Sequence, residues 1–407
     1  MNEMVAPMGS SVPPSPAAKS PMNIALMLES DVPGGAEIMI LQLAEELRRK
    51  GHRPFYVGPE NGSGWLRDRF GELGFDCETF SLRRPVDWRC VRGLVRMLRR
   101  QQVDIVHSHE FTMSIYGAAA ARVIRKPHII THHSNMYFSK KWRRRAAMRW
   151  ACRNSHSVVA VSDVTRRELE DGLGLRPGAV GVVYNGVDHT PGKRELVRQE
   201  VGALPDELLV VALGTVEVRK GHILLLQALS HIRERHPGLS WRVVIAGDDL
   251  GEAKNLLAFA SEHGFADRLH LLGYRSDIAD ILAAADLFVM PSIHEGLPMA
   301  LLEAMIAGLP VVASRAGGMA EAITRDDEGI LVSVGDVQEL AAALERAMTV
   351  PSEREALSQG ARRRAMSAFT LQAMTSVYEE LYLSAGNGSL DRRRLPTARN
   401  STEARAQ

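Results

Sequence analysis

The sequence contains few cysteines and no apolar run long enough to span a membrane. Its three cysteines, Cys77, Cys90 and Cys152, are widely spaced, which indicates neither a disulfide framework nor a zinc site. A membrane-spanning helix needs about 20 consecutive apolar residues, and no segment approaches that length. The N-terminus lacks the basic and then apolar segments of a secretion signal, and its Pro, Ser and Ala content is typical of a disordered leader over residues 1–21. These features predict a cytoplasmic protein.

Two sequence patterns that often mark phosphate sites are also missing. There is no Asp-x-Asp triplet, so a metal-held pyrophosphate is not expected, and Lys, Arg and helix ends would have to neutralise any bound phosphate. There is no complete GxGxxG fingerprint either, because the glycine loop DVPGG lacks the third Gly. Four histidines, His107, His109, His132 and His133, could form a metal site, but no Cys or carboxylate pattern supports one. One histidine binding a ligand while the others pack is the simpler interpretation.

Aromatic residues are scarce, at 5%, and the small net charge of +2 hides an uneven distribution. Residues 21–190 hold 26 Lys and Arg against 18 Asp and Glu, whereas residues 191–380 hold 18 against 27. This asymmetry indicates that the first half meets an anionic partner or surface. The acidic second half and the scarcity of aromatics argue against nucleic acid as that partner.

Short apolar runs alternate with helical patterns along the whole chain. Such alternation predicts parallel sheets covered by helices on both faces. One series of strands precedes about residue 185 and another follows about residue 205, so we expect two doubly wound α/β domains, over residues 22–188 and 189–368, joined by a linker over Gly186–Leu204. A last helical pattern covers about 369–385, and the polar residues 386–407 are expected to be a disordered tail. The predicted strands are Ile24–Leu28, Pro54–Val57, Ile105–His107, Ile129–Thr131, Val158–Val161, Val182–Tyr184, Leu208–Leu213, Arg242–Ala246, Leu269–Leu272, Leu287–Met290, Val311–Ala313 and Ile330–Val332.

Chemically versatile residues follow many of these strands. Open parallel sheets bind ligands beyond the carboxyl ends of their strands, and two such domains facing each other form a cleft. The residues at these ends are the Asp31–Gly35 loop, the four histidines, Asn185, the Glu217–Gly221 loop, Gly247 and Asp248, Gly273–Arg275 and the loop of Glu295.

The segment DLFVMPSIHEGLPMALLEAMIAGLPVVASRAGGMAEAI, from Asp286 to Ile323, is the most informative part of the chain. It predicts a buried strand, a turn with Glu295 and Gly296, a helix and a second strand. The free N–H groups and positive dipole end of that helix would suit a phosphate group. Glu295 and Glu303 flank this seat, where carboxylates would accept hydrogen bonds from the hydroxyls of a sugar and a ribose.

Two further loops have the same strand–loop–helix arrangement. Gly34 and Gly35 let the backbone approach a ligand closely, although an unliganded tight turn would use the same residues. Arg219 and Lys220 precede the first helix of the second domain, where they can neutralise phosphate, although an Arg-Lys pair is more commonly a solvated turn.

Two helical segments of the first half are strongly basic. Arg89, Arg92, Arg96, Arg99 and Arg100 surround an apolar stripe formed by Val91, Leu94, Val95 and Leu98, and the run Lys140–Arg145 precedes Arg149 and Trp150. Basic helices with Trp and Leu can lie on anionic lipid, so peripheral binding to the inner face of the cell membrane is one interpretation. An ordinary surface helix packed by its apolar stripe is the other.

Together these segments resemble family 4 glycosyltransferases over nearly everything from Asn23 to about Leu383. The strongest element is the E-x7-E signature from Glu295 to Glu303, in the form HEGLPMALLEAMIAGLPVVAS. Further matches are DVPGGAE, DIVHSHE, THHS, AVSD, VVYNGVD, KGH, AGD and the Gly317–Glu321 turn. The DVPGG loop is similar to that of bacterial mannosyltransferases acting on membrane phosphoinositides. The resemblance implies the GT-B fold and retaining transfer of a hexosyl unit from a UDP- or GDP-sugar, without a cofactor, to a glycan or lipid-linked acceptor in cell-envelope polysaccharide or glycolipid biosynthesis.

The resemblance also implies roles for individual residues. Glu295 would hold the donor sugar and Glu303 the ribose, while Lys220 would neutralise the diphosphate. The remaining implied contacts are Gly34 and Gly35 closing over the phosphates, the backbone of Gly296, Leu297 and Pro298 beside them, His133 near the sugar, and Gly273, Tyr274 and Arg275 against the base. The chain departs from the family at Thr215, where an Arg is frequent, and Arg219 would compensate.

Two other function classes fit the same features less well. A nucleotide-sugar epimerase of similar fold would need acidic and basic groups over the sugar rather than the E-x7-E pattern. A non-catalytic membrane-surface binding protein would have no use for His133, Lys220, Glu295 and Glu303 together. The binding of a nucleotide sugar, and the product formed from it, separates the three classes.

Overall fold

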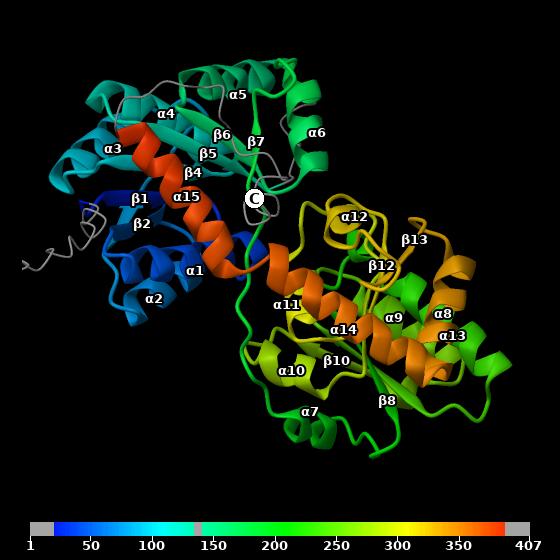
Figure 1. The fold of residues 1–407 in the computed structure, drawn as a ribbon. Helices are drawn as coiled ribbons and strands as arrows, with labels where there is room; N and C mark the ends of the chain where they lie inside the picture. Colours follow the sequence, from blue (N-terminus) through cyan, green and yellow to red (C-terminus); the bar gives the residue numbers. More distant parts are fainter. Residues whose placement is uncertain (1–19, 134–140, 387–407) are drawn as a thin grey trace, which may run out of the picture.

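The computed structural model describes residues 20–133 and 141–386 (Figure 1). The predictions of a disordered leader and tail lie almost entirely outside these residues, as does Lys140 of the second basic segment. Each half of the chain forms a parallel sheet covered by helices on both faces, so the predicted fold class is confirmed. No helix in the described ranges is long and apolar enough to cross a membrane.

The first sheet has seven parallel strands in the order β3-β2-β1-β4-β5-β6-β7. Successive side chains of β1 face opposite sides, with Ile24 and Leu26 packed in one buried cluster and Ala25 and Met27 in another. Helices α1, α2 and α15 cover the first side, and α3 and α4 cover the second. The strands are β1 (Asn23–Met27), β2 (Arg53–Pro59), β3 (Cys77–Phe80), β4 (Ile105–His109), β5 (His128–His132), β6 (Ser157–Ala160) and β7 (Gly181–Val182), and the helices are α1 (Gly35–Arg49), α2 (Trp65–Glu72), α3 (Trp88–Arg100), α4 (Phe111–Ile124), α5 (Trp142–Asn154) and α6 (Asp163–Leu173).

The second sheet has six parallel strands in the order β10-β9-β8-β11-β12-β13. Helices α8, α9 and α13 pack on one face, and α10, α11 and α14 on the other. The strands are β8 (Leu208–Leu213), β9 (Trp241–Ala246), β10 (Leu269–Gly273), β11 (Leu287–Met290), β12 (Val311–Ser314) and β13 (Ile330–Val332), and the helices are α7 (Arg194–Glu200), η2 (Val218–Lys220), α8 (His222–Arg235), α9 (Ala253–Glu262), η3 (Ala266–Arg268), α10 (Ile278–Ala284), α11 (Met299–Ile306), α12 (Met319–Ala322), α13 (Val337–Thr349) and α14 (Pro351–Ala368).

Two elements differ from the sequence-based expectation. Strand β3 was not predicted, because Cys77–Phe80 lies at the edge of the sheet and is only partly buried, so it has no continuous apolar run. The segment expected to be a linker, Gly186–Leu204, contains helix α7, which packs against α10 of the second sheet.

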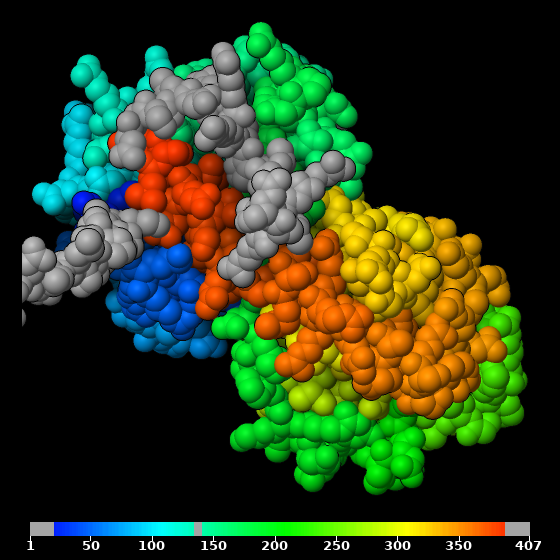
Figure 2. Space-filling model, viewed as in Figure 1, coloured from blue at the N-terminus to red at the C-terminus, as the bar shows by residue number. Residues whose placement is uncertain are grey.

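The last helix, α15 (Leu371–Gly386), returns from the second lobe to the first (Figures 1 and 2). It packs against α1 and β4, where the hydroxyl of Tyr382 lies 2.7 Å from Nδ1 of His107. The other ring nitrogen of His107 lies 2.8 Å from Oγ1 of Thr131, which is 2.9 Å from the hydroxyl of Tyr378. This buried network attaches the end of the chain to the first sheet.

The network predicts the effect of removing a single hydroxyl. Tyr382→Phe leaves a buried imidazole nitrogen without its partner, and we expect the free energy of unfolding to fall by about 1–3 kcal/mol in urea titrations. Tyr274→Phe removes a hydroxyl from a ring that is 41% exposed and should change stability by less than about 0.5 kcal/mol. Equal stabilities of the two variants would contradict this role of the network.

Candidate functional site

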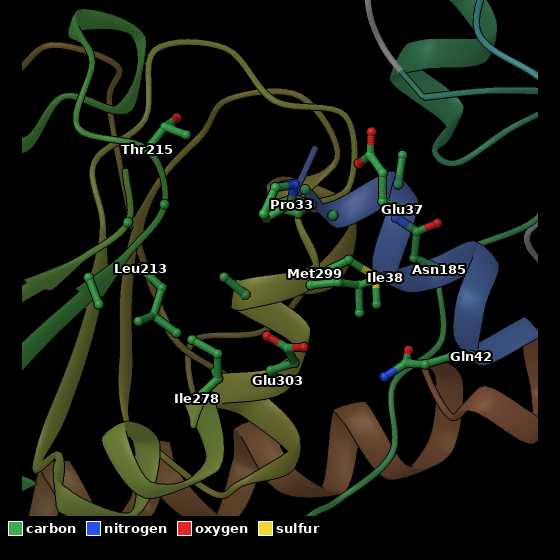
Figure 3. A pocket seen from close by; sticks show the side chains of 18 of the residues that line it. Pro33, Glu37, Ile38, Gln42, Asn185, Leu213, Thr215, Ile278, Met299 and Glu303 are labelled. Atoms are coloured by element: carbon green, nitrogen blue, oxygen red, sulfur yellow. The ribbon is translucent and has the colours of Figure 1, made fainter. Parts of the chain in front are cut away.

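The strand order of each sheet reverses beside its first strand, between β1 and β4 and between β8 and β11. Loops that follow these strands diverge and leave a crevice, the usual ligand site of open parallel sheets. The two crevices open into one cavity of about 1320 Å³ (Figure 3). Among the predicted residues, those that line it are Gly34, Gly35, His132, His133, Asn185, Thr215, Arg219, Lys220, Gly247, Asp248, Tyr274, Arg275, Glu295, Gly296, Leu297, Pro298 and Glu303. Gly273 does not line the cavity, and its carbonyl accepts from the N–H of Gly247.

An ion pair joins the two most informative loops of the second domain. Nζ of Lys220 lies 2.7 Å from Oε1 of Glu295, and only 14% and 8% of the two side chains are exposed. Lys220 reaches this position across Gly214, whose φ of 140° favours glycine and whose missing Cβ would lie 3.2 Å from Cε of Lys220. The pair balances two charges that would otherwise be buried alone, and it places a cation and an anion at one point of the cavity wall.

Helix α11 begins beside this ion pair. Its N-cap residue is Pro298, whose side chain cannot cap the helix, and among the described residues no side-chain cap bonds its first N–H groups. Gly35 of the first domain lies opposite, and a Cβ there would be 3.3 Å from Cγ of Met299. The arrangement gives an anion a helix N-terminus, a lysine and a close-approaching glycine backbone.

Glu303 lies on α11, one turn further into the cavity wall, between Ile278 and Met299 (Figure 3). Burial raises the pKa of this carboxyl to about 7. A carboxylate in such an apolar position gains most from a ligand that donates hydrogen bonds to it, because no Lys, Arg or His within residues 20–133 and 141–386 forms an ion pair with it.

Two aromatic rings from different domains meet at another part of the cavity. Tyr274 and Trp65 have ring centroids 6.4 Å apart in an edge-to-face arrangement. Arg275 is held by the carboxylates of Asp277 and Glu200, at 2.6 and 2.7 Å, and these hydrogen bonds raise its pKa further. The exposed ring of Tyr274 offers a flat apolar surface on which a nucleobase could stack.

The departure from the family at Thr215 has a local consequence. Oγ1 of Thr215 donates to Glu217 at 2.7 Å, and the same carboxylate pairs with Arg219 at 2.7 Å. Arg219 also donates to the carbonyl of His294 and lies 3.6 Å from Oε2 of Glu295. Arg219 therefore brings a second cation to the Glu295 loop, from a different backbone position.

The histidines divide into packed and cavity-lining groups. His107 belongs to the α15 network, and His128 lies between the hydroxyls of Ser108 and Ser155. His133 lines the cavity, and its Nε2 lies 2.9 Å from Nδ1 of His109. Burial lowers the pKa of His133 to about 3, so at neutral pH it is a neutral hydrogen-bonding group. Within residues 20–133 and 141–386, no group of three His, Cys, Asp or Glu side chains is arranged to hold a metal ion.

The first domain contributes carboxylates that the sequence reasoning did not select. Glu29, Glu37 and Glu110 line the cavity, and burial followed by repulsion from Glu37 and Glu29 raises the pKa of Glu110 to about 7 despite its bond from the N–H of Ser30. Asn185 also lines it and donates to the carbonyl of Leu297 at 2.8 Å. Glu110 comes directly after β4 and Glu29 two residues after the end of β1, so the strand-end rule could have found both.

The two halves of the chain match two models of known families. Residues 193–364 match Glycosyl transferases group 1, and residues 33–190 match Glycosyltransferase Family 4. The chain belongs to family 4 of the glycosyltransferases. This family 4 glycosyltransferase is 27% identical over 320 residues to the UDP-Gal:alpha-D-GlcNAc-diphosphoundecaprenol alpha-1,3-galactosyltransferase of Escherichia coli, covering 75% of this chain and 81% of that protein. It is 32% identical over 237 residues to the D-inositol 3-phosphate glycosyltransferase of Saccharomonospora viridis, covering 55% of each protein.

Solved structures show the same GT-B fold. Anabaena Alr3699/HepE in complex with UDP matches this family 4 glycosyltransferase with a TM-score of 0.78 at 22% identity, over 89% of this chain and 100% of that one. WaaG, a glycosyltransferase involved in lipopolysaccharide biosynthesis, matches with a TM-score of 0.66 at 19% identity, over 90% of this chain and 98% of that one.

The raised pKa of Glu303 predicts a pH-dependent cost in stability. The folded protein binds this proton up to about pH 7 and the unfolded chain only up to about pH 4.5, so stability falls as pH rises through this window. Glu303→Gln should therefore raise the free energy of unfolding at pH 8 by at most about 3 kcal/mol and leave it unchanged at pH 4.5. Urea titrations at both pH values measure the difference, with the exposed Glu262→Gln as control. An equal effect of Glu303→Gln at both pH values would exclude the raised pKa.

Proposed function

We propose that this protein is a retaining glycosyltransferase that moves a hexosyl unit from a UDP- or GDP-sugar to a glycan or lipid-linked acceptor. One observation carries the proposal: the Lys220–Glu295 pair lies beside the uncapped N-terminus of α11 and opposite the Gly34–Gly35 loop. A diphosphate needs the cation and the helix end, and a sugar needs the carboxylate, so the two halves of one ligand fit neighbouring groups.

Each part of the donor has a matching surface in this assignment. Lys220, Arg219 and the N-terminus of α11 bind the diphosphate and need no metal ion to balance its charge. The ribose hydroxyls donate hydrogen bonds to the carboxylate of Glu303. These bonds replace the contacts with water that the carboxylate loses by burial. The base stacks on Tyr274. The sugar hydroxyls donate hydrogen bonds to the carboxylate of Glu295 once Lys220 turns to the phosphate.

The reaction breaks the bond between the anomeric carbon and the diphosphate oxygen and forms one to the acceptor oxygen. Positive charge develops on the sugar ring while negative charge develops on the leaving diphosphate, which Lys220 and α11 stabilise. The acceptor attacks from the face that the diphosphate leaves, and its proton passes to a phosphate oxygen. His133, neutral at pH 7, serves as a hydrogen-bonding group beside the sugar rather than as an acid.

The comparisons support both substrates. The E. coli relative is named for a UDP-sugar donor and an acceptor carried on a lipid diphosphate, and a structure of Alr3699/HepE contains UDP-glucose. A role in cell-envelope polysaccharide or glycolipid biosynthesis follows from an acceptor of this kind.

A basic face of the first domain suits an anionic membrane. Helices α3 and α5 both pack against α4, with Trp88 and Trp142 76% and 73% exposed at their starts. Both helices also carry exposed arginines: Arg89, Arg92, Arg96, Arg99 and Arg100 on α3, and Arg143, Arg144 and Arg145 on α5, where Arg143 lies 5.4 Å from the centre of the Trp142 ring. Helices with exposed Trp and several Arg have the composition of a membrane-surface site, so we propose that the enzyme binds the inner face of the cell membrane.

The donor assignment predicts a large loss in Lys220→Ala. Without the cation, kcat should fall by about 100- to 1000-fold and UDP should bind more weakly in calorimetry. The donor is first identified by thermal shift against UDP- and GDP-sugars, and nucleotide release is then followed with and without acceptor. Lys254→Ala, on the exposed face of α9, is the matched control. Full transfer by Lys220→Ala, or an isomerised sugar without nucleotide release, would refute the proposal.

The membrane assignment predicts charge-dependent binding to vesicles. Replacing Arg92, Arg96 and Arg99 by Glu should weaken binding to vesicles of anionic phosphatidylglycerol, measured by co-sedimentation, by about 100-fold, because each basic residue contributes about 1 kcal/mol. Reversing Arg235, Arg325 and Arg362 of the second domain is the control and should leave binding unchanged. An equal loss of vesicle binding in both triple variants would show that the vesicles attract the protein's overall charge and that no defined face binds them.

A further inference from the structure

A carboxylate of the second domain caps a helix of the first. Oε2 and Oε1 of Glu321 accept the N–H groups of Asp163 and Val164 at 2.7 and 2.9 Å, and the hydroxyl of Tyr184 donates to Oε2 at 3.1 Å. The next N–H of helix α6, that of Thr165, is capped by Ser162 within the first domain. The first turn of α6 thus depends on the other domain for two of its hydrogen bonds, and a carboxylate there also complements the helix dipole.

The turn that carries Glu321 also touches the Glu295 loop. The N–H of Gly318 donates to the carbonyl of Gly296 at 2.6 Å. Gly317 has a φ of 54°, and a Cβ on it would lie 1.8 Å from the carbonyl oxygen of Glu295, so only glycine fits. A Cβ on Gly318 would lie 2.8 Å from Cβ of Ser162 in the first domain.

The Glu295 loop is therefore held from the first domain on two sides. Asn185 binds it directly through the carbonyl of Leu297, and Glu321 connects it to α6 through the Gly317–Glu321 turn. If the domains separate, both connections break, whereas the Lys220–Glu295 pair lies wholly within the second domain and persists.

We propose that Glu321 is a positioning residue for glycosyl transfer: by docking on α6 it fixes the Glu295 loop in its working geometry only when the two domains are in contact. The donor binds mainly to the second domain, so it can enter while the domains are apart. When the domains close, Glu321 docks on α6 and fixes the position of the Glu295 carboxylate, which holds the transferred sugar. The chemical step is thereby coupled to contact between the two domains. This inference rests on the role proposed above for Glu295.

A matched pair of variants tests the proposal. Glu328 also accepts two backbone N–H groups and one hydroxyl, from Thr324 and Arg325, but all its partners belong to the second domain. Glu321→Gln places an amide NH₂ against an N–H group and breaks the interdomain contact, whereas Glu328→Gln makes the same chemical change without affecting that contact. We expect about tenfold lower kcat in Glu321→Gln, with the Kd of UDP changed less than about threefold. Glu328→Gln should keep kcat and change thermal stability little, because its three hydrogen bonds all go to Oε2, which the amide oxygen can replace.

Small-angle X-ray scattering provides a readout that does not depend on activity. Glu321→Gln should have a larger radius of gyration than the wild type, and Glu328→Gln should not. Tyr184→Phe, which removes one of the three hydrogen bonds, should lower kcat about twofold and serves if Glu321→Gln fails to fold. A wild-type kcat in Glu321→Gln, or an equal loss of kcat in Glu328→Gln, would overturn the proposal. If the wild type transferred no sugar from any UDP- or GDP-donor, the donor assignment would fail while the scattering comparison would still test the contact.

Discussion

All the functional features of this molecule depend on one constraint, the parallel direction of the strands in each sheet. Parallel strands end at the same edge, so every loop that follows a strand opens on the same side of its domain. The reversal of strand order beside β1 and β8 separates neighbouring loops and leaves room for a ligand there. Because the two edges face each other across the cavity, residues as distant in sequence as Gly34 and Glu303 line one space.

Burial gives the charged groups of this cavity properties they would not have in water. Lys220 and Glu295 balance each other, whereas Glu303 and Glu110 have no cationic partner in the part of the chain that the structure describes, and burial raises the pKa of both carboxyls to about 7. Sites that bind polar ligands commonly carry such a cost in stability, because the groups that suit the ligand are unsuited to an empty cavity. Burial shifts the pKa of His133 in the opposite direction, downwards, because it favours the neutral form of the imidazole.

The charged side chains are also distributed differently from what the net charges of the two halves of the sequence suggested. The first half is basic overall, yet its part of the cavity carries Glu29, Glu37 and Glu110, and the arginines of α3 lie exposed on the surface instead. A count of charges along the chain cannot distinguish these locations, because it ignores which way each side chain points. The arginines of α3 that contribute to that count therefore lie on an outer surface of the first domain.

The sequence by itself determined the fold class, most of the strands and the family, because parallel strands and the E-x7-E segment leave local patterns of apolar and special residues. It also selected Lys220, Glu295 and Glu303, each of which lies in such a motif. Only the tertiary structure showed the edge strand β3, the packing of His107 against α15, and the contacts of Asn185 and Glu321 across the domains. The contacts of His107, Asn185 and Glu321 join residues more than 100 positions apart, and whether such residues meet is decided by how whole domains and the last helix pack, which no local pattern encodes.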